Sequence, residues 1–145
     1  MKLQTGLRRW LKHSRLAFDT SILISLLAEG GADSNTIRIL RLIEEKGNTL
    51  LTSTVTVLEA LVHPYRKKNI AEINAIYGFL TRHRQIELIP LSPEIADKAA
   101  LLRARYGFKT PDAIQLATAV CAKATLFLTR DKDFHKQKEI EVGFL

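Results

Sequence analysis

Two aspartates follow short apolar segments of the kind that form buried strands. Asp19 comes directly after Leu16–Phe18, and Asp131 comes shortly after Leu126–Leu128. The carboxyl ends of neighbouring parallel strands lie at one edge of a sheet, which is where the active sites of open α/β sheets gather. If these two strands are neighbours, the sequence predicts two carboxylates at the same edge.

Three further acids have both a structural and a chemical interpretation. Glu59 is the only charged residue in an apolar helical stretch, but Thr56 and Glu59 also have the spacing of a helix capping box. Asp112 comes just inside an expected helix start, where the first turn favours negative charge in any case. Asp133, two residues after Asp131, is either a further oxygen ligand or a solvated turn residue. The combination of these acids is more specific than any one of them.

Acids that converge in this way need a partner of opposite charge. Three or four carboxylates in one place repel one another. Mg²⁺ prefers oxygen ligands, keeps several waters and also binds phosphate oxygens. Two such ions can hold a phosphodiester for in-line displacement, one activating water and the other stabilising the leaving oxygen. The formal net charge of +7 suits a polyanion such as RNA, although a solvated basic surface would give the same charge. The pattern therefore indicates metal-dependent cleavage of nucleic acid.

Other kinds of site have less support in the sequence. The four histidines lack the spacing of zinc ligands, and a single cysteine cannot form a ligand pair. Neither a Gly-rich phosphate loop nor a nucleophile-elbow motif is present. An enzyme that forms a phosphoryl-aspartate would also use an aspartate at a strand end, but Ser21 stands where its usual second aspartate would follow Asp19.

The composition, 46% hydrophobic and 26% charged, is ordinary for a globular domain. No apolar run of about 18 residues predicts a transmembrane helix, so no membrane partner is expected. Cys121 alone excludes an internal disulfide. These features predict a cytoplasmic protein.

Short apolar segments alternate with helical ones along the chain. Strands are predicted over Arg15–Asp19, Thr49–Thr52, Ile86–Pro90, Thr125–Thr129 and Glu141–Phe144. Helices are predicted over Thr20–Ala28, from a cap at Asp33 or Ser34 to Gly47, and over Thr54–His63, Ile70–Arg82, Pro93–Tyr106 and Thr110–Ala124. Gly30 and Gly31 are expected to stop the first helix. This order predicts an α/β sandwich with a mainly parallel sheet, formed by one domain over residues 15–145 after a basic N-terminal extension, residues 1–14.

Four segments together resemble the PIN domain family, including its VapC-type toxins. They are Ala17–Ser21, Ser53–Glu59, Lys109–Ala117 and Leu128–Phe134, and the resemblance covers roughly Leu16 to Leu145. The resemblance implies a three-layer sandwich, in which about five parallel strands are flanked by helices on both faces. It also implies an acidic pocket that binds Mg²⁺ or Mn²⁺.

The resemblance assigns roles to individual residues. Asp19, Glu59, Asp112 and Asp131 fall on the acidic positions of the family, and Asp133 falls on an auxiliary acidic position of some members. Asp19 and Asp112 are then the principal metal ligands, Asp131 binds metal directly or through water, and Glu59 helps to orient the attacking water. Thr20, Ser21 and Thr129 fall on hydroxyl positions beside the pocket. Arg130 stands where many members have Asn, and is expected either to hold phosphate or to shield the charge of the pocket.

The resemblance thus implies a metal-dependent endoribonuclease, and in particular the toxin of a toxin–antitoxin pair. Its implied partners are an RNA substrate, an antitoxin protein and a second copy of the chain. Two alternatives remain open: a PIN nuclease that processes RNA without being a toxin, and a non-catalytic module that binds RNA or protein. In the extension, Trp10 with Arg8 and Arg9 could contact RNA, or Trp10 could pack on the domain or on a second subunit.

Overall fold

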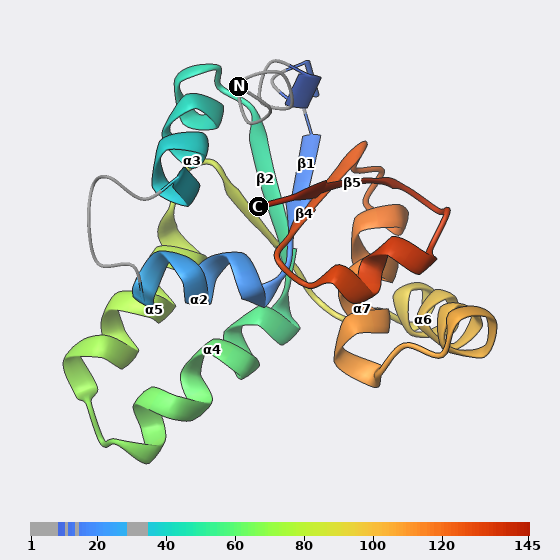
Figure 1. The fold of residues 1–145 in the computed structure, drawn as a ribbon. Coiled ribbons are helices and arrows are strands. Elements are labelled where there is room, and N and C mark those ends of the chain that lie inside the picture. The colour runs from blue at the N-terminus through green and yellow to red at the C-terminus, as the bar shows by residue number, and fades with distance from the viewer. Residues whose placement is uncertain (1–8, 11, 14, 29–34) are drawn as a thin grey trace.

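Five short strands form one sheet, in which every pairing is parallel (Figure 1). The structure, a computed structural model, describes residues 9–10, 12–13, 15–28 and 35–145. The strands lie in the order β3-β2-β1-β4-β5. Their bounds are β1 Arg15–Phe18, β2 Thr49–Ser53, β3 Ile86–Ile89, β4 Leu126–Thr129 and β5 Glu141–Phe144. Strand order reverses on either side of β1, which makes the carboxyl ends of β1 and its neighbours the expected place for a site.

Helices cover both faces of the sheet, so the predicted three-layer α/β sandwich is confirmed (Figure 1). One face carries α2 Thr20–Ala28, α3 Asn35–Glu45, α4 Thr54–Arg66 and α5 Ile70–Arg82. The other carries α6 Pro93–Tyr106, α7 Thr110–Cys121 and the 3₁₀ helix η1 Lys132–Lys136. Successive strand residues point to opposite faces. Leu126 and Leu128 therefore pack in the first core and Phe127 in the second.

The predicted start signal of α6 acts as expected. Ser92 is the N-cap and its hydroxyl accepts a hydrogen bond from the backbone N of Ile95 at 3.2 Å, while Pro93 takes the first helical position. The predicted stop at Gly30 and Gly31 and the predicted cap at Asp33 or Ser34 lie outside the described residues.

Two predicted helix ends are wrong. Helix α4 continues through Pro64 to Arg66 instead of ending at His63. Proline removes one donor from a helix, but Pro64 is buried and packing on the core offsets that loss. Helix α7 ends at Cys121 instead of Ala124, because Lys123 takes a left-handed conformation with φ of 60° that no helix can continue.

The capping-box interpretation of Thr56 and Glu59 is also wrong. The N-cap of α4 is Ser53, whose hydroxyl accepts from the backbone N of Val55 at 3.1 Å. Thr56 lies inside the helix and is fully buried. Glu59 is therefore free of any capping role.

The described part of the N-terminal extension packs against the domain. Trp10 lies against the first core and next to Gly143 of β5. Arg9 forms a 2.8 Å salt bridge with Glu141. Of the interpretations that the sequence left open for Trp10, the structure shows packing on the domain. The division of the chain at residue 14 stays a prediction.

Within the described residues, no helix has both the length and the apolar character needed to cross a membrane.

Candidate active site

The first two aspartates meet because β1 and β4 are neighbours. Phe18 and Leu128 are paired in the register of the two strands, and Asp19 follows directly after β1. The backbone N of Asp19 donates to the carbonyl of Leu128 at 3.3 Å. One residue, Arg130, separates Asp131 from the end of β4. Both carboxylates therefore lie at the carboxyl edge of the sheet, as the sequence predicted.

The structure brings all four predicted catalytic acids to one pocket at this edge. The pocket has a volume of about 210 Å³. Its lining includes Asp19, Glu59, Asp112 and Asp131. Asp19 follows β1, Glu59 comes from the middle of α4, Asp112 from the first turn of α7, and Asp131 from the end of β4. Four separate segments thus contribute one acid each, which a purely structural role for each acid does not explain.

Asp19 is the most buried of these acids, and hydroxyl groups hold its carboxylate. Its Oδ1 accepts from the hydroxyl and backbone N of Ser21, at 2.5 and 3.1 Å. Its Oδ2 accepts from the hydroxyl of Thr129 at 2.6 Å. Burial nevertheless raises the pKa of Asp19 above its usual value, and the hydrogen bonds only partly offset that rise.

The pKa of Asp112 reflects both its burial and its closeness to the other acids of the pocket. Burial and then the charges of the neighbouring carboxylates, Asp131 before Glu59 and Asp19, raise its pKa to about 6. This rise occurs although Asp112 lies in the first turn of α7, where the helix dipole favours a negative charge. Burial and the neighbouring charges together therefore outweigh the stabilisation that the helix N-terminus provides.

The salt bridges between described residues involve acids other than the four that line the pocket. These acids are Glu44, Glu87, Asp133, Glu139 and Glu141. Across the same residues, no three side chains are arranged as a ready set of metal ligands. Mg²⁺ does not require such a set, since it binds through one or two carboxylates and keeps several waters. A lining with four carboxylates fits that ion, because Oδ2 of Asp19, which accepts only the hydrogen bond from Thr129 among the described residues, retains a further lone pair.

The predicted auxiliary residues differ in their positions. Thr20 and Ser21 line the pocket, and Thr129 lies beneath it on Asp19. Asp133 does not line the pocket; it is exposed, and its carboxylate pairs with Lys136 at 2.9 Å. Its charge still contributes, as the weakest cause, to the raised pKa of Asp112.

Arg130 also lies outside the pocket lining. Its backbone N donates to the hydroxyl of Ser21 at 2.9 Å, and its guanidinium donates to the hydroxyl of Ser25 on α2. The backbone of Arg130 thus supports Ser21, while its side chain is directed along α2.

One functional candidate, Gln115, was missed by the sequence prediction. It is buried in α7 and lines the same pocket. Its amide nitrogen donates to the hydroxyls of Thr20 and Thr56, at 3.1 and 2.8 Å. Thr20 in turn donates to Oε1 of Glu59 at 2.8 Å. Gln115 is the only amide in an otherwise apolar stretch three residues after Asp112, and that was the available signal.

The hydrogen bonds beneath the pocket form a chain in which each donor can be assigned, from Gln115 through Thr56 and Thr52 to the carbonyl of Phe18. Thr56 lies 2.7 Å from Thr52, whose hydroxyl donates to the carbonyl of Phe18 at 2.8 Å. Since the one hydroxyl hydrogen of Thr52 goes to Phe18, the Thr56 hydroxyl donates to Thr52 while it accepts from Gln115. The network joins the end of β1 to β2, α4 and α7, so it positions the elements that carry three of the four acids.

Solved structures share this fold over most of their length. A toxin–antitoxin complex from Klebsiella pneumoniae is 28% identical, with a TM-score of 0.64, and the match covers 86% of this chain and 94% of the other. VapBC2 from Rickettsia felis, bound to a DNA fragment of its promoter, has a TM-score of 0.75 at 16% identity, covering 90% and 98%. VapC20 from Mycobacterium tuberculosis, a sarcin-ricin loop cleaving toxin, has a TM-score of 0.66 at 18% identity, covering 88% and 98%.

The comparison with curated proteins gives no match. The family comparison is positive, and the PIN domain model matches residues 16–140. That span includes every acid of the pocket and ends directly before β5. The chain therefore belongs to the PIN domain family.

Proposed function

We propose that this chain is a metal-dependent endoribonuclease and the toxin of a toxin–antitoxin pair. One observation carries the proposal: acids from four separate segments line one small pocket, where burial and then their mutual repulsion raise the pKa of Asp112 to about 6. A fold gains nothing in stability from such repulsion, so a ligand of positive charge accounts for it. The further step from that ligand to RNA hydrolysis rests on the family and on the charge of the chain.

In the proposed mechanism, Asp19 and Asp112 hold a divalent cation, and Asp131 assists them directly or through a water. When bound, that cation neutralises charge on the scissile phosphate and lowers the pKa of a water. Glu59 accepts a hydrogen bond from this water and orients its oxygen toward phosphorus. The oxygen of the water bonds to phosphorus as the bond to the leaving ribose oxygen breaks. One proton of the water passes to solvent, and the leaving oxygen gains a proton from solvent.

The chain's own hydrogen bonds keep two of these carboxylates in place. Ser21 and Thr129 fix the Asp19 carboxylate from two sides, so it loses little freedom when it binds a cation. Thr20 fixes one oxygen of Glu59 and leaves the other for the water. Such supporting partners matter because misplacement of a catalytic group by even about 1 Å is costly.

RNA is proposed as the substrate for two reasons. The formal net charge of +7 favours a polyanion. One solved neighbour is a toxin described as cleaving the sarcin-ricin loop, and that activity supports RNA as the substrate here. Two other neighbours are toxin–antitoxin assemblies, which supports an antitoxin as the partner of this chain. A homodimer and a cytoplasmic location remain part of the proposal.

The test is a cleavage assay with single-stranded RNA, run on the wild type and on Asp19→Asn and Asp112→Asn. The wild type should cut internally with Mg²⁺ or Mn²⁺ and stop when EDTA is added. Both variants should lose at least about a hundredfold in rate, since each removes a charge that binds the cation. Asp97→Asn is the matched control, because Asp97 is exposed on α6 away from the pocket.

Two results would overturn this proposal. Unchanged cleavage by both variants would remove the assigned acids from the mechanism. A wild type that binds RNA without cutting it, in either metal, would favour the non-catalytic binding module.

A further inference from the structure

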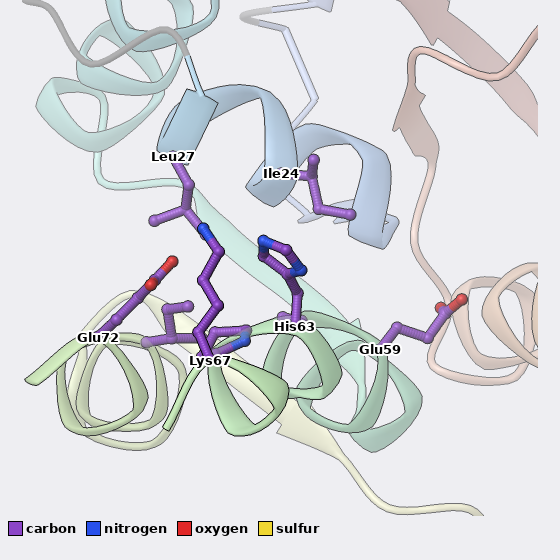
Figure 2. A pocket seen from close by; sticks show the side chains of 9 residues that line it. Ile24, Leu27, Glu59, His63, Lys67 and Glu72 are labelled. Atoms are coloured by element: carbon purple, nitrogen blue, oxygen red, sulfur yellow. The ribbon is translucent and has the colours of Figure 1, made fainter. Parts of the chain in front are cut away.

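A second, larger cavity adjoins the acidic pocket. This cavity, called the α4 groove below, lies between α2, α4 and α5 and has a volume of about 410 Å³ (Figure 2). Glu59 and Ile24 line both the groove and the acidic pocket, so the two cavities lie side by side. An endonuclease holds a strand that continues on both sides of the cut. Any strand bound with its scissile phosphate at the four acids must therefore leave the pocket through such an opening.

Three polar side chains follow one line along the floor of the α4 groove. Glu59, His63 and Lys67 are four residues apart, which places Glu59 and His63 on one face of α4 and Lys67, the C-cap residue, in line with them. The helical rise puts His63 about 6 Å and Lys67 about 12 Å from Glu59 along the helix axis. In Figure 2, His63 rises from α4 below Ile24, Lys67 extends toward Leu27, and Glu59 points toward α7.

His63 and Lys67 are available to a ligand. Both are exposed. No hydrogen bond or ion pair of the imidazole or of the ammonium group joins it to the other described residues. The opposite wall is apolar: Ile24 and Leu27 of α2 are 51% and 48% exposed. In the groove, the imidazole of His63 thus faces the apolar wall of α2, and the ammonium group of Lys67 lies beyond it.

The charge around the outer end of the groove favours a polyanion. Lys67 lies between Arg66 and Lys68 in the turn that joins α4 to α5, which makes three consecutive cations. Among the described residues that line the groove, the one acid at this end is Glu72. It accepts a hydrogen bond from the amide of Asn69 at 3.0 Å and lies at the N-terminus of α5, where the helix dipole offsets its charge.

We propose that the α4 groove binds the nucleotide next to the scissile phosphate, with its base between His63 and Ile24 and its outer phosphate at Lys67. Single-stranded RNA is recognised by bases that are unstacked and laid on aromatic rings, histidine included. Charged grooves that follow the backbone supply the remaining affinity. The order along α4, carboxylate then imidazole then ammonium, matches the order of scissile phosphate, base and next phosphate. This inference rests on the proposed function and adds to it the path of the strand.

The first test measures RNA binding separately from cleavage. Short oligonucleotides of U, A, C or G are titrated in Mg²⁺ into full-length protein that carries Asp112→Asn and therefore does not cut. Adding His63→Ala should weaken binding by about five- to a hundredfold, the usual effect of removing a stacking ring. Adding His63→Phe should keep most of the affinity, because a ring remains.

The second test uses salt to count phosphate contacts. Each lost contact to single-stranded nucleic acid reduces the slope of log K against log salt by about 0.7. Lys67→Ala should reduce the slope by about that amount. Lys46→Ala is the matched control, since Lys46 is exposed and precedes β2, at the opposite edge of the sheet from the acids. In the active chain, Lys67→Ala should raise KM several-fold and leave kcat close to wild type.

A third measurement avoids substitution. In the unmutated protein, RNA should protect Lys67 from a lysine-acetylating reagent, as read by mass spectrometry, and should leave Lys46 reactive. Unchanged affinity in His63→Ala together with an unchanged salt slope in Lys67→Ala would overturn the groove proposal. The same would hold if these variants lost only the binding of a protein partner. Neither result would touch the nuclease proposal, which depends on Asp19→Asn and Asp112→Asn.

Discussion

Thr129 donates a hydrogen bond to Oδ2 of Asp19 over 2.6 Å, although 110 residues separate the two in the chain. The contact joins the end of β4 to the end of β1, which are neighbouring strands. Thr129 and Asp19 are both buried. Asp19 is the most buried carboxylate of the site. Among the described residues, hydroxyl groups and not a cationic side chain hold it.

Thr129→Val should remove this support while keeping the shape of the side chain. A hydrogen bond to a charged group contributes about 1.5–3 kcal/mol, so the free energy of unfolding should fall by about that amount at pH 7. Loss of an outer partner of a metal ligand should also weaken Mg²⁺ binding by about ten- to a hundredfold. Urea denaturation and Mg²⁺ titration measure the two effects. Thr129→Ser keeps the donor and should stay close to wild type; equal losses in both variants would contradict the role of the hydroxyl.

The raised pKa of Asp112 predicts a pH dependence of stability. Because its pKa is about 6 in the folded chain and 3.8 ordinarily, the folded state binds more protons between these values. Stability from this residue is thus complete below about pH 4 and is lost as pH rises through 6. Asp112→Asn should therefore stabilise the metal-free protein at pH 7. The full shift would correspond to about 3 kcal/mol, and partial exposure of the group reduces the expected gain to about 1 kcal/mol.

The measurement is the difference in unfolding free energy between Asp112→Asn and wild type at pH 7 and at pH 4, in EDTA. Most of the gain should be lost at pH 4, where Asp112 of the folded wild type is protonated and carries no charge. Mg²⁺ should stabilise the wild type at pH 7 and have less effect on Asp112→Asn, since ligand binding to the native state adds stability. A gain that is equal at both pH values would show that repulsion at Asp112 is not its source.

The acids of the site could be predicted from sequence because they form a specific combination and three of them stand beside a local structural signal. Asp19 and Asp131 follow apolar strands, and Asp112 follows a helix-start proline. The parallel sheet then brings strand ends together without further information. The sequence left the β1–β4 pairing as a condition, since short apolar strands carry no signal of their neighbours, and the structure shows the pairing.

The features that the sequence did not predict depend on contacts between distant residues. The course of α4 past Pro64 depends on burial of that proline, which local propensity does not reveal. The role of Gln115 depends on hydroxyls that lie 95 and 59 residues away in the chain. A single amide in an apolar helix indicated only that some polar partner must exist.

Gln115→Leu should separate positioning from stability. The buried amide contacts Thr20 and Thr56, and leucine would fill similar space without donating to either hydroxyl. Thr20 would then be free to turn away from Glu59. Replacing a supporting residue of this kind typically costs about ten- to a hundredfold in activity, so kcat should fall within that range and KM should change little. Thr118→Val, which removes a buried hydroxyl on the same helix that bonds only to the carbonyl of Ile114 among the described residues, is the control.

A lower kcat in Gln115→Leu could also result from partial unfolding of α7. Far-UV circular dichroism and urea denaturation of both variants distinguish the two. If Thr118→Val loses as much activity as Gln115→Leu, the network has no specific role in holding Glu59.

Gly143 and Trp10 offer a test of the packing of the N-terminal extension. A Cβ atom at Gly143 would lie 2.9 Å from Cδ2 of Leu128 and 3.0 Å from Cε2 of Trp10. Real Cβ atoms do not approach so closely, so Gly143→Ala must displace one of them. Overpacking of this kind costs about 1–3 kcal/mol. Because the indole is the only one in the chain, its fluorescence should report the displacement directly.

A double-mutant cycle with Trp10→Ala assigns that cost. If the indole is the group that yields, Gly143→Ala should be less destabilising in the Trp10→Ala background, with a coupling of about 0.5 kcal/mol or more by circular dichroism. Strictly additive losses would mean that Leu128 yields instead. Since Leu128 pairs with Gly143 and directly precedes Thr129, that outcome carries a second consequence: a shifted Leu128 would move the hydroxyl that holds Asp19, and RNA cleavage should fall together with stability.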